Sequence, residues 1–170
     1  RRPSPLGSPP SRLPEAATFV IFSDHEVSSA VAPFEHKVRS MSGPTFEHRN
    51  GMEIATFTDA SQWEAWLATH GAERREIWMR IARADSGHTT VTADQALDVC
   101  LCYGWIDSLR RSDEGGYFLQ RYSPRRPGSP WSKINAAKVE ALLAADRMQP
   151  AGLAEVAAAK ANGRWPRDLS

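Results

Sequence analysis

The spacing of apolar and polar residues predicts that the patterned region of this chain begins near residue 53. Between residues 58 and 71, apolar side chains recur at the i, i+3, i+4 and i+7 spacing of one helix face. The residues on this face are Trp63, Trp66, Leu67 and His70. Thr58 and Asp59 can cap the start of the helix, and Gly71 can end it. We therefore expect a helix that buries two tryptophans in the core.

A strand and a second helix are predicted next. In residues 76–82, large apolar side chains occupy every second position, so the segment is predicted to be a strand. The alternating apolar residues are Ile77, Met79 and Ile81. Thr92 and Gln95 then match a capping box, in which each side chain accepts a hydrogen bond from the backbone amide of the other residue. We expect the helix that follows to end at Gly104, which suits a left-handed closing residue.

The rest of the pattern predicts a hairpin and two helices. Residues 105–111 and 117–122 are expected to be strands joined by the loop 112–116. After a proline-rich loop, Ser129 is expected to cap a third helix. The apolar side of that helix is expected to hold Trp131, Ile134, Ala141, Leu142 and Ala145. A fourth helix should begin at Pro150 and pack against the third as a helical hairpin.

These elements predict an α+β domain over residues 53–165. In it, about four helices pack on one face of a small antiparallel sheet of about three strands. Residues 1–51 hold seven of the twelve prolines and little to bury, so we expect a disordered segment or a non-native extension there. Residues 166–170 are expected to form an irregular tail.

Composition and charge argue against several classes of protein. A net charge of +1 over 170 residues argues against a nucleic-acid partner, whose binding needs a surplus of Lys and Arg. No apolar run reaches the roughly 20 residues that cross a bilayer, and the start does not resemble a signal peptide. We therefore expect a cytoplasmic protein without a membrane span. Cys100 and Cys102 are two positions apart on a helix, so they predict packed thiols rather than a disulfide.

The sequence predicts neither a metal site nor a cofactor. His70 and His88 have no partner at the spacing of metal ligands, and the other three histidines lie in the segment 1–51. The chain also lacks the GxSxG, GxGxxG and GxxxxGK[ST] motifs, which argues against the hydrolase, dinucleotide-binding and P-loop classes.

The segment 121–135 is the strongest candidate for a binding site. Its basic residues come without a single acid and lead into a predicted helix start, where free amides and the helix dipole favour an anion. The candidate anion-binding residues are Arg121, Arg125, Arg126, Ser129, Trp131, Ser132, Lys133 and Asn135. The alternative is a solvated basic loop in which Ser129 only caps its helix and Trp131 only packs in the core. The expected partner is an anionic small molecule or another protein.

Asp107 is the one candidate for a catalytic group. It lies in a predicted strand just after Trp105, where it either faces solvent by simple alternation or acts as a general base in a cleft. The second possibility makes the chain a small enzyme acting on a phosphorylated or carboxylate substrate, with Asp107 as base and Arg121 or Arg125 as anion clamp.

Four blocks of sequence resemble a known family. They are LCYGWID at residues 101–107, YSPRR at 122–126, SPWSKIN at 129–135 and RMQPAGL at 147–153. With these blocks the chain resembles the YdeI/OmpD-associated family of bacteriocin-protection proteins over roughly residues 55–165. The resemblance implies a cytoplasmic bacterial protein that confers tolerance of bacteriocins or cationic antimicrobial peptides, and it brings no established reaction.

The resemblance also carries an expectation about association. Family members usually continue beyond the Gly163–Trp165 region into a further helical module rich in Arg and Lys, and this chain stops at Ser170. Functions that depend on that module are therefore in question for this chain. Its absence would leave apolar helix faces open, so we expect self-association or marginal stability.

Overall fold

The computed structural model describes residues 43–168, which form five strands and four helices. The strands are β1 (Thr45–Arg49), β2 (Met52–Thr56), β3 (Ile77–Ala82), β4 (Trp105–Ser112) and β5 (Tyr117–Pro124). The helices are α1 (Ala60–His70), α2 (Ala93–Cys102), α3 (Lys133–Ala144) and α4 (Pro150–Ala161). The predictions for residues 1–42 and for 169–170 lie outside the described residues.

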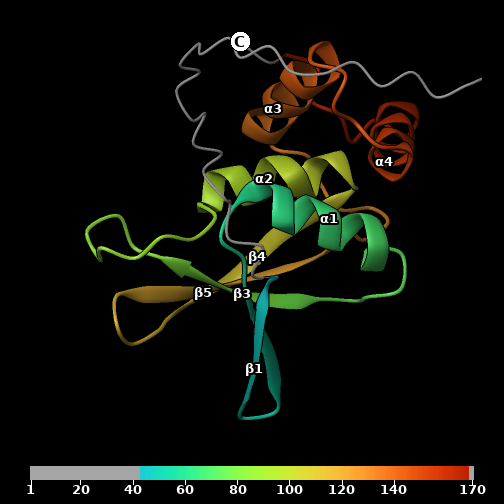
Figure 1. Cartoon of the computed structure of the whole chain (residues 1–170). Helices are drawn as coiled ribbons and strands as arrows, with labels where there is room; N and C mark the ends of the chain where they lie inside the picture. Colours follow the sequence, from blue (N-terminus) through green and yellow to red (C-terminus); the bar gives the residue numbers. More distant parts are fainter. Residues whose placement is uncertain (1–42, 169–170) are drawn as a thin grey trace, which may run out of the picture. The chain divides into compact units, whose positions relative to one another are not determined.

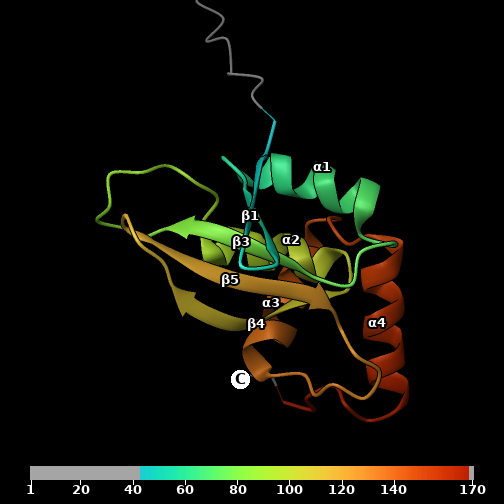
Figure 2. The same cartoon turned by 90° about the horizontal axis from the view of Figure 1, so that it is seen from below.

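The described elements form three layers (Figure 1). The sheet is one layer, α1 and α2 lie against it, and α3 and α4 lie on the far side of α2. Seen from below, the strands lie in front of α1 and α2, so these helices cover one face of the sheet (Figure 2). None of the helices in residues 43–168 is long and apolar enough to span a bilayer.

The sheet is mixed, with strand order β1-β2-β3-β5-β4. Neighbouring strands are antiparallel except β2 and β3, which run parallel because α1 carries the chain back between them. The α+β class agrees with the sequence, but the prediction of an antiparallel sheet of about three strands is wrong, since the described residues form five strands.

The two missed strands, β1 and β2, form a tight hairpin. Asn50 and Gly51 connect them with φ angles of 52° and 74°, the left-handed pair that a two-residue hairpin turn requires. Most of β1 is exposed, so it has no apolar face to reveal. In β2, Ile54 and Ala55 are both fully buried, on opposite faces of the sheet, so β2 does not alternate either. The folded region therefore begins inside the segment 1–51, earlier than predicted.

An aromatic cluster fills the space between the sheet and α1. Trp63 and Trp66 stack with ring centroids 5.3 Å apart, and Trp105 meets both rings edge-on at 6.3 Å. Phe57 and Tyr122 complete the cluster, and all five side chains are buried. The prediction that α1 buries two tryptophans is confirmed.

The second helix, α2, is buried on two sides, which explains its two cysteines. Cys100 packs in the core above the sheet, while Cys102 packs in a separate cluster against α3 and α4. Both thiols are free, as the sequence predicts. Burial raises the pKa of each thiol above its ordinary value, so both stay protonated at neutral pH.

Most predicted helix ends agree with the structure, but the start of α3 does not. Asp59 caps α1, Thr92 and Gln95 form the capping box of α2, and Gly104 follows with a φ of 73°. For α3, the prediction of Ser129 as the cap is wrong, because the helix begins three residues later than expected, with Ser132 as its cap.

The predicted apolar side of α3 is also partly wrong. Ile134 is 72% exposed, and the buried face consists of Ala136, Val139 and Leu142. Of these, Val139 and Leu142 pack in the cluster that also holds Cys102 of α2. Leu142 alone of the predicted helical residues lies on that face. Leu153 on α4 is also exposed.

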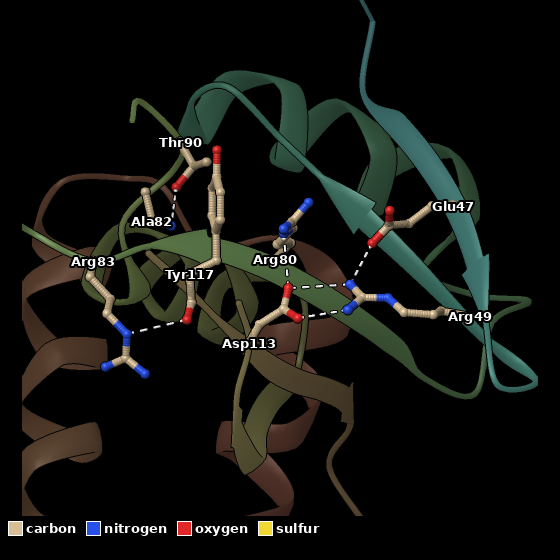
Figure 3. A network of polar contacts seen from close by, with 8 residues as sticks. All are labelled: Glu47, Arg49, Arg80, Ala82, Arg83, Thr90, Asp113 and Tyr117. Atoms are coloured by element: carbon tan, nitrogen blue, oxygen red, sulfur yellow. Dashed lines mark hydrogen bonds and ion pairs between the residues drawn. The ribbon is translucent and has the colours of Figure 1, made fainter. Parts of the chain in front are cut away.

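Asp113 ties the two ends of the sheet together (Figure 3). Its two carboxylate oxygens accept hydrogen bonds from Arg49 of β1 at 2.7 and 3.2 Å. Arg80 of β3 adds an ion pair, with its Nε 2.9 Å from Asp113 Oδ2. The Asp113 side chain is only 4% exposed, and hydrogen bonding from Arg49 holds its pKa below the ordinary value. We call these three residues the Asp113 clasp.

Replacing Asp113 should weaken the fold in a pH-dependent way. At pH 7, Asp113→Asn should lower the free energy of unfolding by about 1–2 kcal/mol, because charge-assisted hydrogen bonds to partly solvated arginines are lost. Since the folded-state pKa of Asp113 is lowered, its contribution is present above pH about 4 and disappears as the pH falls through that lowered pKa. Urea unfolding as a function of pH measures both effects.

The matched control is Glu114→Gln at the exposed neighbouring position. It should leave the free energy of unfolding unchanged within about 0.5 kcal/mol. Equal stability of the two variants at pH 7 would contradict a stabilising role for the Asp113 clasp.

Candidate functional site

An open cleft of about 730 Å³ lies between the α1–β3 loop and the β5–α3 loop. Its lining contains five arginines and two glutamates, so it carries an excess of positive charge. The arginines are Arg74, Arg75, Arg121, Arg125 and Arg126. We call this space the arginine cleft. The pairing of Ile77 with Tyr122 in the sheet brings the two loops together, since it sets the start of β3 beside the end of β5.

Two of these arginines are held by carboxylates. Arg121 forms an ion pair with Glu76, which comes from the opposite loop, and its Nε donates to Glu76 Oε2 at 3.0 Å. Arg74 lies 3.1 Å from a carboxylate oxygen of Glu53 and 5.8 Å from the centre of the Trp66 ring. These pairs fix the positions of the two side chains and offset their charge.

Two other arginines remain available. Arg75 and Arg126 are exposed, one on each side of the arginine cleft. Within residues 43–168, neither forms an ion pair with a carboxylate. A guanidinium presents planar N–H donors that match the oxygens of a phosphate or carboxylate. The two side chains can therefore contact an oxyanion without first releasing an internal partner.

Arg125 is buried at the inner side of the cleft, with 6% of its surface exposed. Its Nη2 donates to Ser129 Oγ at 3.2 Å and to the Pro130 carbonyl at 2.7 Å. The guanidinium carbon lies 3.8 Å from the centre of the Trp131 ring, a cation–π contact. Burial lowers the pKa of Arg125, and the positive charge of Arg164 acts in the same direction.

The surroundings of Arg125 contain buried polar atoms with no hydrogen-bond partner among the described residues. They are Arg125 Nε, Trp131 Nε1 and Glu155 Oε2. The negative charge of Glu155 raises the pKa of Arg125 and so partly offsets the lowering caused by burial. Buried polar atoms usually have a partner in the protein or in ordered water. This region therefore has unused capacity for hydrogen bonds beside the arginine cleft.

The structure separates the predicted binding residues into four groups. Arg121, Arg125 and Arg126 line the arginine cleft. Ser129 lines a smaller adjoining cleft of about 360 Å³, which also includes Arg121 and Arg126. Trp131 is buried behind Arg125 and packs against Trp165, with ring centroids 4.9 Å apart.

The remaining predicted residues belong to the start of α3 and line neither cleft. Ser132 Oγ accepts from the Asn135 amide at 3.1 Å, so Ser132 serves as the helix cap. Lys133 Nζ lies 3.4 Å from Asp168 Oδ2. The expectation that the start of this helix and the arginines form one pocket is therefore not met by the linings of these clefts.

Asp107 lies outside the linings of both clefts, although its negative charge acts on buried Arg125. It sits opposite Tyr122 in the pairing of β4 and β5 and is half-buried. Neither cleft includes it in its lining, although its neighbours Ile106 and Ser108 line the smaller one. In residues 43–168 no group of three or more His, Cys, Asp or Glu is arranged to hold a metal ion.

Sequence reasoning missed Arg74 and Arg75. Both lie in the charged run Glu73–Glu76, directly before β3. The charged run was visible in the sequence, but only the pairing of β3 with β5 in the structure places it beside Arg121 and Arg126.

Comparison with known proteins gives one family. A family model described as a domain of unknown function, DUF8412, matches residues 55–155. No curated protein and no solved structure matches the chain. The family match does not test the resemblance to the YdeI/OmpD-associated family, which stays a prediction.

Alanine substitutions at the adjacent residues Arg125 and Arg126 should differ in their effect on stability, because only Arg125 is buried. Arg125→Ala should lower the free energy of unfolding by about 2 kcal/mol, because it uncovers Trp131 and removes the donor of two hydrogen bonds. Arg126→Ala should change it by less than about 0.5 kcal/mol, since that side chain is exposed. Urea unfolding monitored by tryptophan fluorescence measures the difference, and equal effects of the two variants would show that Arg125 is not structural.

Proposed function

The chain belongs to the DUF8412 family of unknown function, and from the arginine cleft we propose that the domain binds a small oxyanion, a phosphate or a carboxylate. The observation that carries the proposal is the pair Arg75 and Arg126, which line the cleft from its two loops, are exposed, and have no carboxylate partners in residues 43–168.

The fixed residues around this pair favour binding. Arg121 is already positioned by Glu76, and buried Arg125 adds positive charge at the inner side of the cleft. Bringing like charges together costs free energy unless an anion offsets them. A bound oxyanion would lower that cost and accept hydrogen bonds from guanidinium groups on both loops.

We propose that this binding serves tolerance of bacteriocins or cationic antimicrobial peptides. The resemblance of residues 101–107, 122–126, 129–135 and 147–153 to the YdeI/OmpD-associated family supports this role. The positive arginine cleft would repel a cationic peptide, so the cleft would act through an anionic metabolite, headgroup or partner protein.

Binding without catalysis is the function favoured here. The alternative, a small enzyme with Asp107 as base, needs that carboxylate at the bound anion, and Asp107 does not line the arginine cleft. The proposal therefore gives Asp107 no contact with the ligand.

Calorimetric titration with inorganic phosphate, in buffers whose ionic strength is matched with chloride, tests the proposal. The wild type should show saturable binding. Arg75→Ala combined with Arg126→Ala should weaken it by about tenfold or more, since two charge-assisted contacts are lost. The control is Arg83→Ala combined with Arg147→Ala, which removes the same charge from exposed residues outside the cleft lining.

The control variant should bind phosphate as the wild type does. Equal weakening in both double variants would mean that net charge alone attracts the anion. Absence of saturable binding by the wild type to phosphate and to acetate would overturn the proposal.

A further inference from the structure

An apolar pocket of about 350 Å³ adjoins the arginine cleft. It lies where the end of α1, the start of β4 and the start of α4 meet. Leu67 and Trp105 supply buried walls, and Tyr103 and Pro150 complete the apolar surface. Because Leu67 and Trp105 belong to the packed core, the shape of the pocket is set by the fold rather than by mobile surface side chains.

Three observations show that the pocket and the arginine cleft are neighbours. Ala72 lines both spaces. Trp105 of the pocket pairs in the sheet with Pro124 of the cleft. The amide of Arg125 donates to the Gly104 carbonyl at 3.0 Å, so the residue that precedes Trp105 is bonded directly to the cleft wall.

The two spaces differ in chemistry. The cleft presents guanidinium groups, while the pocket presents aromatic and aliphatic surface with Gln149 as its one amide side chain. Small-molecule sites in proteins combine such an apolar wall with a few polar groups that fix orientation, in volumes of about 300–1,000 Å³. A ligand spanning both spaces needs a charged end and a flat apolar end.

We propose that the arginine cleft and the apolar pocket form one composite site for an oxyanion that carries an aromatic group. This inference rests on the proposed function, because the oxyanion end occupies the arginine cleft. The aromatic end lies in the pocket against Trp105, Tyr103 and Pro150, where it leaves water for an apolar surface.

The test compares anions of equal charge with and without a ring. Each anion is titrated separately into the full chain at matched ionic strength. The affinity for phenyl phosphate is compared with that for methyl phosphate, and the affinity for phenylacetate with that for acetate. For phosphate, carboxylate or both, the aromatic anion should bind about tenfold or more tightly than its small counterpart, because burying a ring contributes about that factor.

A pair of variants on α1 locates the aromatic end. Ala68 lines the pocket and is exposed, so Ala68→Trp should block the pocket without disturbing the core. It should remove the aromatic gain and leave binding of methyl phosphate unchanged within about twofold. Ala65 is exposed on the same helix but does not line the pocket, so Ala65→Trp should keep the gain.

The outcomes separate this inference from the proposed function. Binding of methyl phosphate or acetate without any aromatic gain would overturn the composite site and leave the oxyanion site standing. An aromatic gain that survives Ala68→Trp would also overturn it, because the ring would then bind elsewhere. If neither methyl phosphate nor acetate binds to the wild type, the proposed function fails, and the inference, which rests on it, fails with it.

Discussion

The close approach of α4 to the turn at Gly104 is the constraint on which the rest of the structure depends. Gly104 has a φ of 73°, and a Cβ there would lie 3.1 Å from the Ala151 carbonyl oxygen, so both conformation and space favour glycine. Gly152 of α4 comes nearer still to the end of α2, since its Cβ would lie 2.2 Å from the Cys102 carbonyl oxygen. The backbones of α4 and of the end of α2 are in direct contact here, so any residue larger than glycine would force them apart.

The position of that turn decides where the core and both candidate binding spaces lie. Trp105 follows Gly104 directly and closes the aromatic cluster over Trp63 and Trp66. The Gly104 carbonyl also holds the amide of Arg125, which starts the loop that lines the arginine cleft. A shift of the turn would therefore change core packing and cleft shape together, because interiors at native packing density transmit such movements.

Much of the fold followed from local sequence signals, and the failures have local causes too. The caps Asp59 and Thr92 and the hairpin of β4 and β5 agree with the structure, because capping residues and turn glycines act within a few positions. The sheet was underestimated because β1 is exposed and β2 is buried on both faces, so neither alternates. The Asn50–Gly51 turn carried the missing information, but it lay in a segment whose composition predicted disorder.

The candidate site was predictable on one side only. Arg121 and Arg126 lie in a single basic segment, which composition reveals, whereas Arg75 reaches the same cleft through the pairing of β3 with β5. The burial of Arg125 against the Trp131 ring depends on how the loop folds, and a basic loop in sequence gives no indication of which of its cations leaves water. The start of α3 was misplaced because Ser129 meets the sequence preference for a cap but is engaged by Arg125 and Arg164 instead.

The Asp113 clasp has a consequence for folding kinetics. Arg49 and Asp113 are 64 residues apart in the chain, so their contact forms only after a long loop has closed. Local elements such as α1, α2 and the β4–β5 hairpin can form before that closure, because their own contacts are shorter in sequence. The clasp therefore adds a long-range step to folding, and the entropy of closing this loop must be offset before β1 is held at its edge of the sheet.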